Sequence, residues 1–376
     1  MGRLMGRYRI LVHGAGRMAH AIANTLAADP RFDAWLSSPE PEIGARAEAL
    51  HPGVRRVAVS LSAPREGLPA GLGAIIMAGD VWARTADVAR LARELGCHYL
   101  DITEDPDATA EIVSVAAGAR SCFAPACGLA PGYVTALTAQ TMRRAGPGAR
   151  ITVHVGVLPA RRENRLGYGN LLGVDGLMVE YTSPCLAIRG GRQVTLPPMT
   201  EAETVKLGGE AFESFTTAGS LDALVRAPGV SVESLVFKTL RYPGHLDYMR
   251  FLLDDLGLSR QRHQLRSLLM NGLPVVAEDR VLIALDVETA QGERTRTEQV
   301  IAAQRGHDGT WHSAGVTATV AHVCAMADLL CQGTLSHAGF LSQGAVAPDL
   351  LAQSRFFAPI APTPRLVAAS MNGTCP

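Results

Sequence analysis

The chain has 376 residues, of which 47% are hydrophobic and 19% are charged. This length is too great for one ordinary core and predicts two domains, and the composition is typical of a globular protein. Lys and Arg together number 35, as do Asp and Glu, so the formal net charge is zero. No broad basic surface is therefore expected, which argues against binding to nucleic acid or to an anionic membrane.

The seven cysteines are scattered along the chain. Cys122 and Cys127 are close, but no second close pair or histidine cluster completes a zinc site, so no metal is expected. We interpret the cysteines as free thiols in a reducing cytoplasm. The most apolar late stretch, 316–330, is interrupted by His322 and Asp328 and is not expected to span a bilayer. The protein is therefore predicted to be cytoplasmic.

From residue 8 to about residue 126, short apolar runs alternate with segments of helical periodicity. Strands separated by helices predict a doubly wound parallel sheet. The run at 74–77 is apolar throughout, as a strand buried on both faces should be. We therefore predict an α/β Rossmann domain over residues 1–127. Its strands are expected at 8–13, 32–36, 54–60, 73–77, 98–102 and 121–125, and its helices at 17–26, 81–95 and 107–119.

The pattern changes after Pro131. Gly190-Gly191 predicts a tight hairpin because both residues tolerate positive φ, and a second hairpin is expected near Gln291-Gly292. Residues 128–315 are predicted to form an α+β domain with a mixed or antiparallel sheet, whose exposed edge favours a homodimer. A helix at about 316–333 is expected to pack back on the first domain, and 334–376 form a C-terminal tail. The later strands are expected at 150–158, 185–188, 193–196, 231–241, 280–289 and 295–304.

The sequence Gly14-x-Gly16-x-x-Ala19 lies between the first expected strand and the first expected helix. Gly14 permits a tight turn, Gly16 lets the backbone approach a diphosphate, and the small Ala19 lets helix and strand pack closely. The N–H groups that begin the helix, at Arg17, Met18 and Ala19, attract phosphate. The pattern predicts a dinucleotide-binding loop. The alternative is a structural turn in a fold that has lost its cofactor.

The tip of the second strand distinguishes NAD from NADP. An NAD enzyme usually places Asp or Glu there to bind the ribose 2′-hydroxyl, whereas this chain has Ser37-Ser38-Pro39 followed by Glu40. The missing carboxylate favours NADP, whose 2′-phosphate Ser37, Ser38 and Arg17 could contact. NAD stays open because Glu40 could fold back onto the ribose, and Arg17 could be only a solvated first-turn residue.

A series of motifs follows, at 125–132, 155–159, 166–170, 176–184, 212–220 and 238–245. They read PACGLAPG, VGVLP, LGYGN, GLMVEYTSP, FESFTTAGS and KTLRYPGH. In this order and approximate spacing they resemble the saccharopine dehydrogenase-like family, and lysine 6-dehydrogenase in particular. The resemblance runs from the glycine loop to the last helix. It implies hydride exchange between a nicotinamide cofactor and a carbon that bears nitrogen.

Two departures from the lysine 6-dehydrogenase pattern leave alternatives open. The acid at the tip of the second strand is absent, which leaves the choice of NAD or NADP undecided. The segment around Tyr168 has glycine and asparagine where that enzyme type carries further polar groups, which leaves lysine itself undecided as substrate. The family also includes reductases that join an amine to a carbonyl compound through an imine. Amine oxidation and imine reduction are therefore both considered.

Ligands of a doubly wound sheet bind at the carboxyl ends of its strands. Asp101, after the fifth strand, is a candidate catalytic residue, although it could instead cap the following turn. Thr103 could likewise begin the next helix, and the turn at 128–132 could be only a hinge. Candidate cofactor contacts at these ends are Ala78, Gly79, Thr103, Gly128 and Leu129.

Six further candidates lie in the family-like motifs of the second domain. His245 is the candidate base, because its ordinary pKa is near neutrality, and its alternative is a histidine that caps the next helix. Arg241 can bind a substrate carboxylate bidentately, or it can be a structural ion-pair partner. Tyr168 could bind the amine or be a core aromatic residue.

Glu180 could hold a substrate ammonium group, although on a helix it could be only solvated. Thr216 and Thr217 could be pocket donors or strand-end residues. We predict an NAD(P)-dependent oxidoreductase that acts on a C–N bond of a small amino-acid or amine substrate. Two alternatives are a carbon–oxygen dehydrogenase and a catalytically inactive, dinucleotide-binding regulator.

Overall fold

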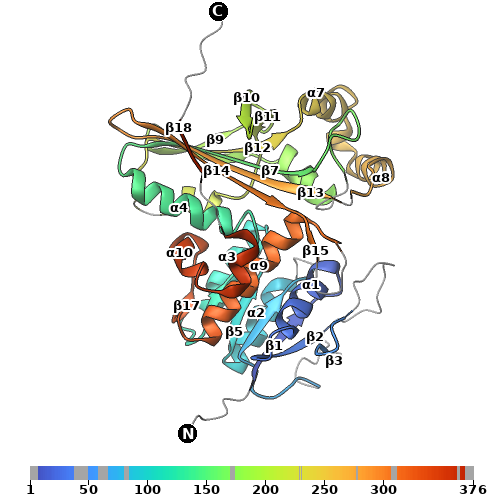
Figure 1. Ribbon diagram of the computed structural model, residues 1–376, viewed down its shortest axis with the longest axis vertical. Coiled ribbons are helices and arrows are strands. Elements are labelled where there is room, and N and C mark those ends of the chain that lie inside the picture. The colour runs from blue at the N-terminus through green and yellow to red at the C-terminus, as the bar shows by residue number, and fades with distance from the viewer. Residues whose placement is uncertain are drawn as a thin grey trace, which may run out of the picture. The chain divides into compact units, whose positions relative to one another are not determined.

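The computed structural model describes residues 7–37, 50–57, 67–79, 84–169, 174–227, 229, 231–276, 278–305, 311–361 and 365–368. The chain divides into two compact units, which together contain all the elements drawn in Figure 1. Unit 1 comprises residues 1–136, 305–310 and 316–361, and unit 2 comprises residues 137–304, 311–315 and 362–376. Unit 1 is therefore assembled from the beginning of the chain and from a late segment.

Unit 1 is built on a seven-stranded sheet in the order β17-β6-β5-β4-β1-β2-β3, in which all pairs are parallel. The central strand β1 pairs with β2 and β4, so Val12 lies between Leu36 and Ile76. This order confirms the predicted doubly wound sheet of a Rossmann domain. The strands are β1 (Tyr8–His13), β2 (Phe32–Ser37), β3 (Arg55–Val57), β4 (Ala74–Met77), β5 (His98–Asp101), β6 (Cys122–Ala124) and β17 (Gly339–Phe340).

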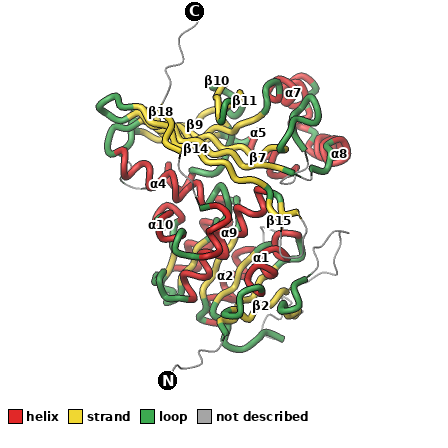
Figure 2. Tube along the Cα trace, in the orientation of Figure 1, coloured by secondary structure: helices red, strands yellow, loops and turns green. Residues whose placement is uncertain are grey.

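Capping residues fix the ends of helices in unit 1. Asp105 caps α3 (Pro106–Ala116) by accepting hydrogen bonds from two backbone N–H groups, and a proline occupies the first turn. Gly96, at φ 68°, ends α2 (Thr85–Leu95) in the left-handed conformation. Helix α1 spans Arg17–Ala27. Figure 2 shows these helices beside the strands of the parallel sheet.

The long helix α9 (Ala314–Cys331) is a core element of this fold. By length and composition it is the one helix within the described ranges that could cross a membrane, yet 89% of its 18-residue window is buried inside the structure. Arg31, just before β2, lies 2.8 Å from Asp328 on α9, which joins helix and sheet. The expected C-terminal tail also contributes structure, at η4 (Gln343–Ala345), α10 (Pro348–Leu351) and η5 (Arg355–Ile360), besides β17 and a later strand β18.

Unit 2 contains a nine-stranded sheet whose main path is β10-β11-β12-β7-β13-β14-β18, with β8 beside β12 and β9 beside β8. Every pair is antiparallel except β12 with β7, so the predicted mixed sheet is confirmed. The strands are β7 (Arg150–Pro159), β8 (Cys185–Arg189), β9 (Arg192–Leu196), β10 (Glu203–Leu207), β11 (Glu210–Thr216), β12 (Ser234–Arg241), β13 (Asp279–Glu288), β14 (Arg294–Ala302) and β18 (Arg365–Ala368).

Both predicted hairpins are present, β8–β9 at Gly190-Gly191 and β13–β14 near Gly292. A third hairpin, β10–β11, turns at Gly208-Gly209 and was not predicted. A two-stranded pair joins β15 (Gln304–Arg305) to β16 (Trp311–His312). The helices are α4 (Tyr133–Ala145), which begins in unit 1, and α5 (Val174–Thr182), α6 (Asp222–Val225), α7 (His245–Arg250), the π-helix η2 (Phe251–Asp255), η3 (Leu258–Arg260) and α8 (Arg262–Gly272).

Candidate functional site

The glycine loop joins β1 to α1 and packs directly against the end of β4. Gly14 has φ 155°, and a Cβ there would lie 2.7 Å from the carbonyl oxygen of Ala78 and 3.0 Å from the Cβ of Ala19. The Gly14 N–H donates to the Ser37 carbonyl at 2.9 Å, and the Ala78 N–H donates to the His13 carbonyl at 2.8 Å. These contacts explain why this position takes glycine, since any side chain would collide with the backbone of β4's loop.

The N-terminus of α1 has no capping side chain among the described residues. Gly16 occupies the N-cap position, the first turn contains no acidic residue, and the first helical bond runs from His20 N to Gly16 O. The N–H groups of Arg17, Met18 and Ala19 precede that bond, so they have no intrahelical acceptor. Such an end attracts an anion. The residues therefore fit the diphosphate of a dinucleotide.

Gly79 adds a second close approach beside the same loop. A Cβ at Gly79 would lie 3.2 Å from the Met77 side chain and 3.7 Å from the Cα of Gly14. Ala78 is buried, whereas Arg17 is exposed at the start of α1. Gly14, Gly16 and Gly79 have no side chains, so a ligand at this loop would meet main-chain groups.

The tip of β2 uses its serine inside the fold. Ser37 is buried, and its hydroxyl lies 3.3 Å from Nδ1 of His13 on β1. Burial, with the charge of Arg84 as a smaller cause, lowers the pKa of His13 to about 4. His13 is thus neutral at pH 7, and Ser37 links two strands. Ser38 and Glu40 lie outside the described residues.

Asp101, at the end of β5, organises two loops. Its Oδ1 accepts hydrogen bonds from Thr103 N at 2.9 Å and Ala126 N at 2.8 Å, and its Oδ2 accepts one from the Tyr99 hydroxyl at 2.8 Å. Burial raises the pKa of Asp101 to about 6, although these three donors oppose the rise. Thr103 is also buried, and its hydroxyl accepts from Asp105 N. The carboxylate therefore holds the loop after β5 to the loop after β6.

The loop at 125–132 is fixed from the later part of the chain. His322 on α9 donates from Nδ1 to the Gly128 carbonyl at 2.9 Å, and the Gln343 amide donates to the Pro125 carbonyl at 2.7 Å. A Cβ at Gly132 would lie 2.0 Å from the Gly128 oxygen, so the turn requires glycine. Leu129 is buried. Residue spacing gave no indication of His322 and Gln343 as partners of this loop, because they lie about 200 residues away along the chain.

In unit 2 the structure brings together Tyr168, Glu180, Arg241 and His245, all candidates from the sequence. Arg241, at the end of β12, is buried and donates from Nε to the Tyr181 hydroxyl at 2.7 Å and from Nη2 to Glu180 Oε2 at 3.2 Å. Its Nη1 donates to the Leu240 carbonyl at 2.9 Å and to the Thr239 hydroxyl. We call Tyr168, Tyr181, Thr239, Arg241 and His245 the Arg241 cluster.

Two aromatic rings flank the guanidinium of Arg241. Its central carbon lies 5.1 Å from the ring centroid of Tyr168 and 5.6 Å from that of Tyr181, within the range of cation–π attraction. Burial opposes the charge of Arg241, but its interactions with Tyr181, Tyr168 and Glu180 outweigh burial and raise the pKa of Arg241, so the guanidinium is charged. Tyr181 lies in one of the motifs of the sequence, at 176–184, but was assigned no role there. In the structure its ring lies beside Arg241, and its hydroxyl bonds both Arg241 and His245.

His245 begins α7 and is fully buried, with both ring nitrogens engaged. Nδ1 donates to the Leu166 carbonyl at 2.8 Å, so Nε2 accepts from the Tyr181 hydroxyl, also at 2.8 Å. Burial and the nearby charge of Arg241 lower the pKa of His245 to about 3. The imidazole is therefore neutral at pH 7, and accepting a proton would break its bond with Tyr181.

Glu180 lies next to the Arg241 cluster and is partly exposed to solvent. Its side chain is 33% exposed, whereas those of the cluster are buried. Desolvation raises the pKa of Glu180, and Arg241 partly offsets that rise. Its backbone carbonyl accepts from Ala218 N at 3.0 Å, which places the loop after β11 beside it.

The two threonines of that loop differ. Thr216 is buried, and its hydroxyl accepts from Thr200 N at 3.0 Å and donates to the Pro197 carbonyl at 2.9 Å. Thr217 is also buried, but within the described parts of the chain its hydroxyl has no hydrogen-bond partner. An unsatisfied buried hydroxyl is costly, which makes Thr217 the stronger candidate for contact with a ligand.

A serine, a histidine and an aspartate also meet elsewhere in unit 2. His154 on β7 bonds Ser214 at 2.7 Å and Asp286 at 3.2 Å, and Arg296 binds the same aspartate. Ser214 and His154 are buried, so no substrate carbonyl can reach the hydroxyl. The group ties the β10–β11 hairpin to the sheet and is not a hydrolytic triad.

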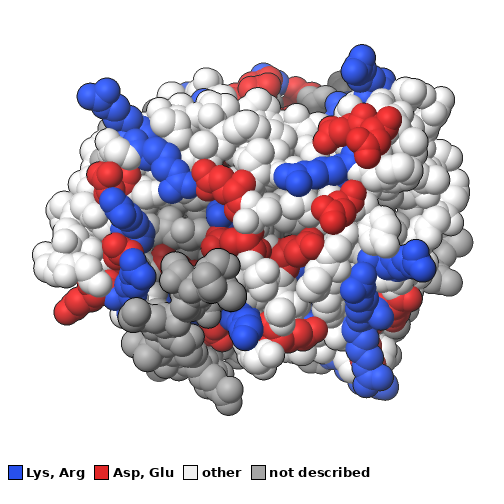
Figure 3. Space-filling view, turned by 90° about the horizontal axis from the view of Figure 1, so that it is seen from above, with Lys and Arg blue, Asp and Glu red and all other residues white. Residues whose placement is uncertain are grey.

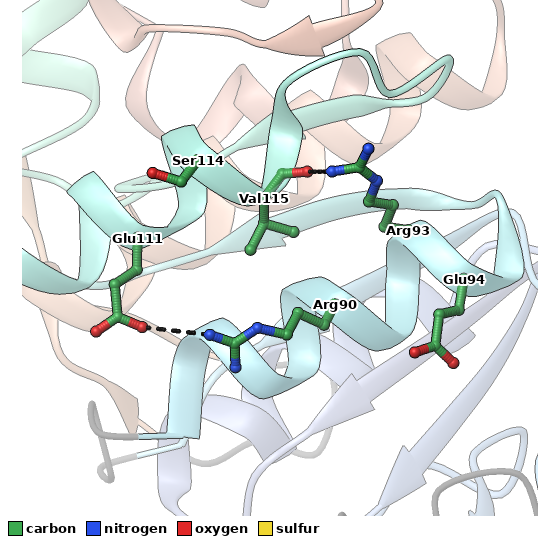
Figure 4. A pocket seen from close by; sticks show the side chains of 6 residues that line it. All are labelled: Arg90, Arg93, Glu94, Glu111, Ser114 and Val115. Carbon is green, nitrogen blue, oxygen red and sulfur yellow. Dashed lines mark hydrogen bonds and ion pairs between the residues drawn. The ribbon is translucent and has the colours of Figure 1, made fainter.

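One surface groove of unit 1 lacks such a cluster of buried polar side chains. A shallow groove between α2 and α3 is lined by Arg90, Arg93, Glu94, Glu111, Ser114 and Val115, and its arginines are directed to Glu111 and to the Val115 carbonyl (Figure 4). Figure 3 shows one face of the molecule, where basic and acidic side chains are interspersed. No group of three or more histidine, cysteine or acidic residues suited to a metal occurs in the described ranges.

The parallel sheet with its glycine loop defines a Rossmann-type domain, here followed by an α+β unit. A family model of the saccharopine dehydrogenase C-terminal domain matches residues 128–360. The match covers more than half of the chain, which therefore belongs to the saccharopine dehydrogenase family and so to the oxidoreductases. The resemblance seen in the sequence is confirmed at the level of the family.

The chain is also similar to solved structures, the first of which shares its fold. Apo histidine-tagged saccharopine dehydrogenase (L-Glu forming) from Saccharomyces cerevisiae matches with a TM-score of 0.71 at 17% identity, covering 92% of this chain and 95% of that one. A meso-dapdh mutant with DAP from Clostridium tetani matches with a TM-score of 0.45 at 11% identity, covering 92% and 96%. GenD2 from gentamicin A biosynthesis, in complex with NAD, matches with a TM-score of 0.44 at 11% identity, covering 90% of each chain.

Proposed function

We propose that this chain is an NAD(P)-dependent oxidoreductase that acts on a C–N bond of an amino-acid substrate. One observation carries the proposal: the loop at Gly14 and Gly16 presses against β4 and leaves the first N–H groups of α1 without acceptors. A backbone site of this kind suits a diphosphate. Membership of the saccharopine dehydrogenase family supports chemistry at a carbon that bears nitrogen.

The cofactor is assigned to unit 1. Gly14, Gly16, Arg17, Met18 and Ala19 would hold its diphosphate, and Ala78 and Gly79 would line the neighbouring strand end. The bound nicotinamide supplies or accepts the hydride. We favour NADP over NAD because Ser37 stands at the end of β2, where NAD enzymes usually place an acid. The exposed Arg17 is available to a 2′-phosphate.

The substrate's amino group is assigned to unit 2. Four of the five N–H donors of Arg241, on Nε, Nη1 and Nη2, already have acceptors, so the cation supports Glu180 more readily than it binds a substrate carboxylate bidentately. Glu180 presents a partly exposed carboxylate to an ammonium group. Tyr168 and His245 pack around the same cation and orient it. Amine oxidation and imine reduction both use this arrangement, because each has a nitrogen cation to bind.

Isothermal titration calorimetry with NAD and NADP, followed by absorbance assays with a panel of amino acids and amines, tests the proposal. We expect one dinucleotide to bind and its nicotinamide absorbance to change with an amine from the panel. Turnover with alcohols instead favours a carbon–oxygen dehydrogenase, and binding without turnover favours a regulator. If neither dinucleotide binds, the proposal fails. A homodimer, tested by light scattering, stays a prediction, as does the cytoplasmic location.

A further inference from the structure

We propose that Glu180 is the catalytic base, accepting the proton that the substrate ammonium must lose before hydride can leave. The inference rests on the proposed function and assigns a proton-transfer step within it. It departs from the expectation that His245 performs this role. The argument follows from which groups beside Arg241 still have a free position for a proton.

The hydrogen bonds through the Arg241 cluster have a fixed direction. Arg241 Nε donates to the Tyr181 oxygen, the Tyr181 hydroxyl donates to His245 Nε2, and His245 Nδ1 donates to the Leu166 carbonyl. Because the guanidinium and the carbonyl end this chain, no member can take a further proton without breaking a buried bond. This series of hydrogen bonds therefore positions the guanidinium of Arg241 and does not relay a proton.

Glu180, in contrast, has a carboxylate oxygen that can accept a proton without breaking a buried bond. Arg241 binds its Oε2, and no hydrogen bond to its Oε1 occurs among the described residues, while a third of the side chain is exposed. Arg241 from β12 and Tyr181 from its own helix interact with Glu180, and Tyr168 from the preceding loop and His245 from α7 lie beside the same Arg241. Helix α8 packs against α5 and carries Arg262, His263 and Arg266. Burial raises the pKa of the carboxyl, which improves it as a base.

Thr217 supplies an independent sign of a ligand at this position. Its hydroxyl is buried without a partner in the part of the chain described, and the next residue donates its N–H to the Glu180 carbonyl. The loop continues into Ser220, a non-glycine residue held at φ 55°. In this proposal the hydrogen-bonding group that Thr217 lacks is assigned to the substrate bound beside Glu180.

The step balances as follows. The carboxylate of Glu180 takes one proton from R₂CH–NH₃⁺, which leaves the neutral amine and a carboxylic acid. The C–H bond would then break, and its electron pair would leave as hydride, which an oxidised nicotinamide dinucleotide bound at the glycine loop would accept. The nitrogen lone pair forms the C=N bond of the iminium R₂C=NH₂⁺. Imine reduction reverses this order, with Glu180 returning the proton.

The test measures kcat and KM across pH for the wild type, Glu180→Gln and Glu180→Asp, with NADP or NAD and the best amine of the panel, beginning with L-lysine. We expect wild-type kcat/KM to fall at acid pH, and Glu180→Gln to lose kcat by about 100-fold or more and to lose the acid limb. Glu180→Asp should keep that limb and recover part of the rate. Glu278→Gln, an exposed glutamate of the same unit, serves as the matched control.

The outcomes separate the two proposals. A Glu180→Gln enzyme that raises KM but keeps kcat and the acid limb shows an ammonium anchor and overturns the base. Calorimetry on Glu180→Gln should give the wild-type dinucleotide affinity, because Glu180 lies in unit 2 and the glycine loop in unit 1. A wild type that binds neither dinucleotide removes the proposed function and this step together. A wild type that oxidises an amine with no acid limb overturns the base alone.

Discussion

The glycine loop of unit 1 and the Arg241 cluster of unit 2 are built on opposite principles. The loop exposes backbone donors that have no side-chain acceptor among the described residues, whereas the cluster consists of side chains whose donors and acceptors are nearly all paired. A backbone site depends on the absence of Cβ atoms, so its function is sensitive to small additions. A paired cluster depends on each partner, so its stability is sensitive to losses.

The largest expected effect breaks the cluster. Arg241→Met removes the cation and leaves the Glu180 carboxylate and the Tyr181 oxygen without their donor, which should lower the free energy of unfolding by about 3–5 kcal/mol. Urea denaturation measures it. Arg294→Met is the matched control: that arginine is 65% exposed and pairs with Glu288 on the surface, so we expect a change of no more than about 1 kcal/mol. Equal losses in the two variants would mean that the cluster is no more than a surface ion pair.

The next effect concerns the loop and leaves the cluster intact. Gly14→Ala places a methyl group 2.7 Å from the Ala78 oxygen, so the loop must shift away from β4. We expect dinucleotide affinity to fall by about 100-fold, equivalent to about 2.7 kcal/mol. Calorimetry measures it, with Gly272→Ala as control, because a Cβ at Gly272 meets nothing within 4 Å. Unchanged affinity would remove the diphosphate from this loop.

The same contrast explains what the sequence could predict. Gly14, Gly16 and Ala19 act through backbone sterics, which extend over a few residues of chain, so the turn from β1 to α1 and the parallel sheet were both predicted. The alternation of apolar strands with helices predicted the doubly wound parallel sheet of unit 1, although not β17, and Gly190-Gly191 predicted a hairpin of unit 2. Local patterns of this kind survive in the sequence because neighbours along the chain are also neighbours in space.

The roles within the candidate site could not be predicted in this way. The sequence identified His245 and Arg241 as candidate site residues. Whether the imidazole of His245 can accept a proton depends on Tyr181 and Leu166, which lie 64 and 79 residues away along the chain. Spacing says nothing about those bonds. The β10–β11 hairpin was also missed, although Gly208-Gly209 at its turn is the same local signal as Gly190-Gly191. Long-range pairing therefore decides the roles of the site residues, whereas this hairpin could have been predicted from its turn.

The smallest expected effects concern the dependence of stability on pH. Each unit contains a buried group whose pKa is shifted, and the two shifts have opposite directions. In unit 2 the pKa of His245 falls to about 3 from its ordinary 6.5. Below pH 6.5 the unfolded chain takes up a proton that the folded chain refuses, so stability is present above 6.5 and is lost as pH falls toward 3. We expect a loss of about 2 kcal/mol at pH 5 from this residue. His245→Gln should remove that slope, and His337→Gln, an exposed histidine, should not.

In unit 1 the pKa of Asp101 rises to about 6 from its ordinary 3.8, because burial outweighs its three donors. Here the folded state keeps the proton longer than the unfolded one, so stability is lost as pH rises from 3.8 toward 6. Asp101→Asn keeps an acceptor oxygen for Thr103 N and Ala126 N while removing the charge. Its stability relative to wild type should therefore increase by about 2 kcal/mol between pH 4 and pH 6. Denaturation at several pH values measures how the stability of each variant, relative to wild type, changes with pH. Changes of the same sign in His245→Gln and Asp101→Asn would contradict the buried states assigned to these residues.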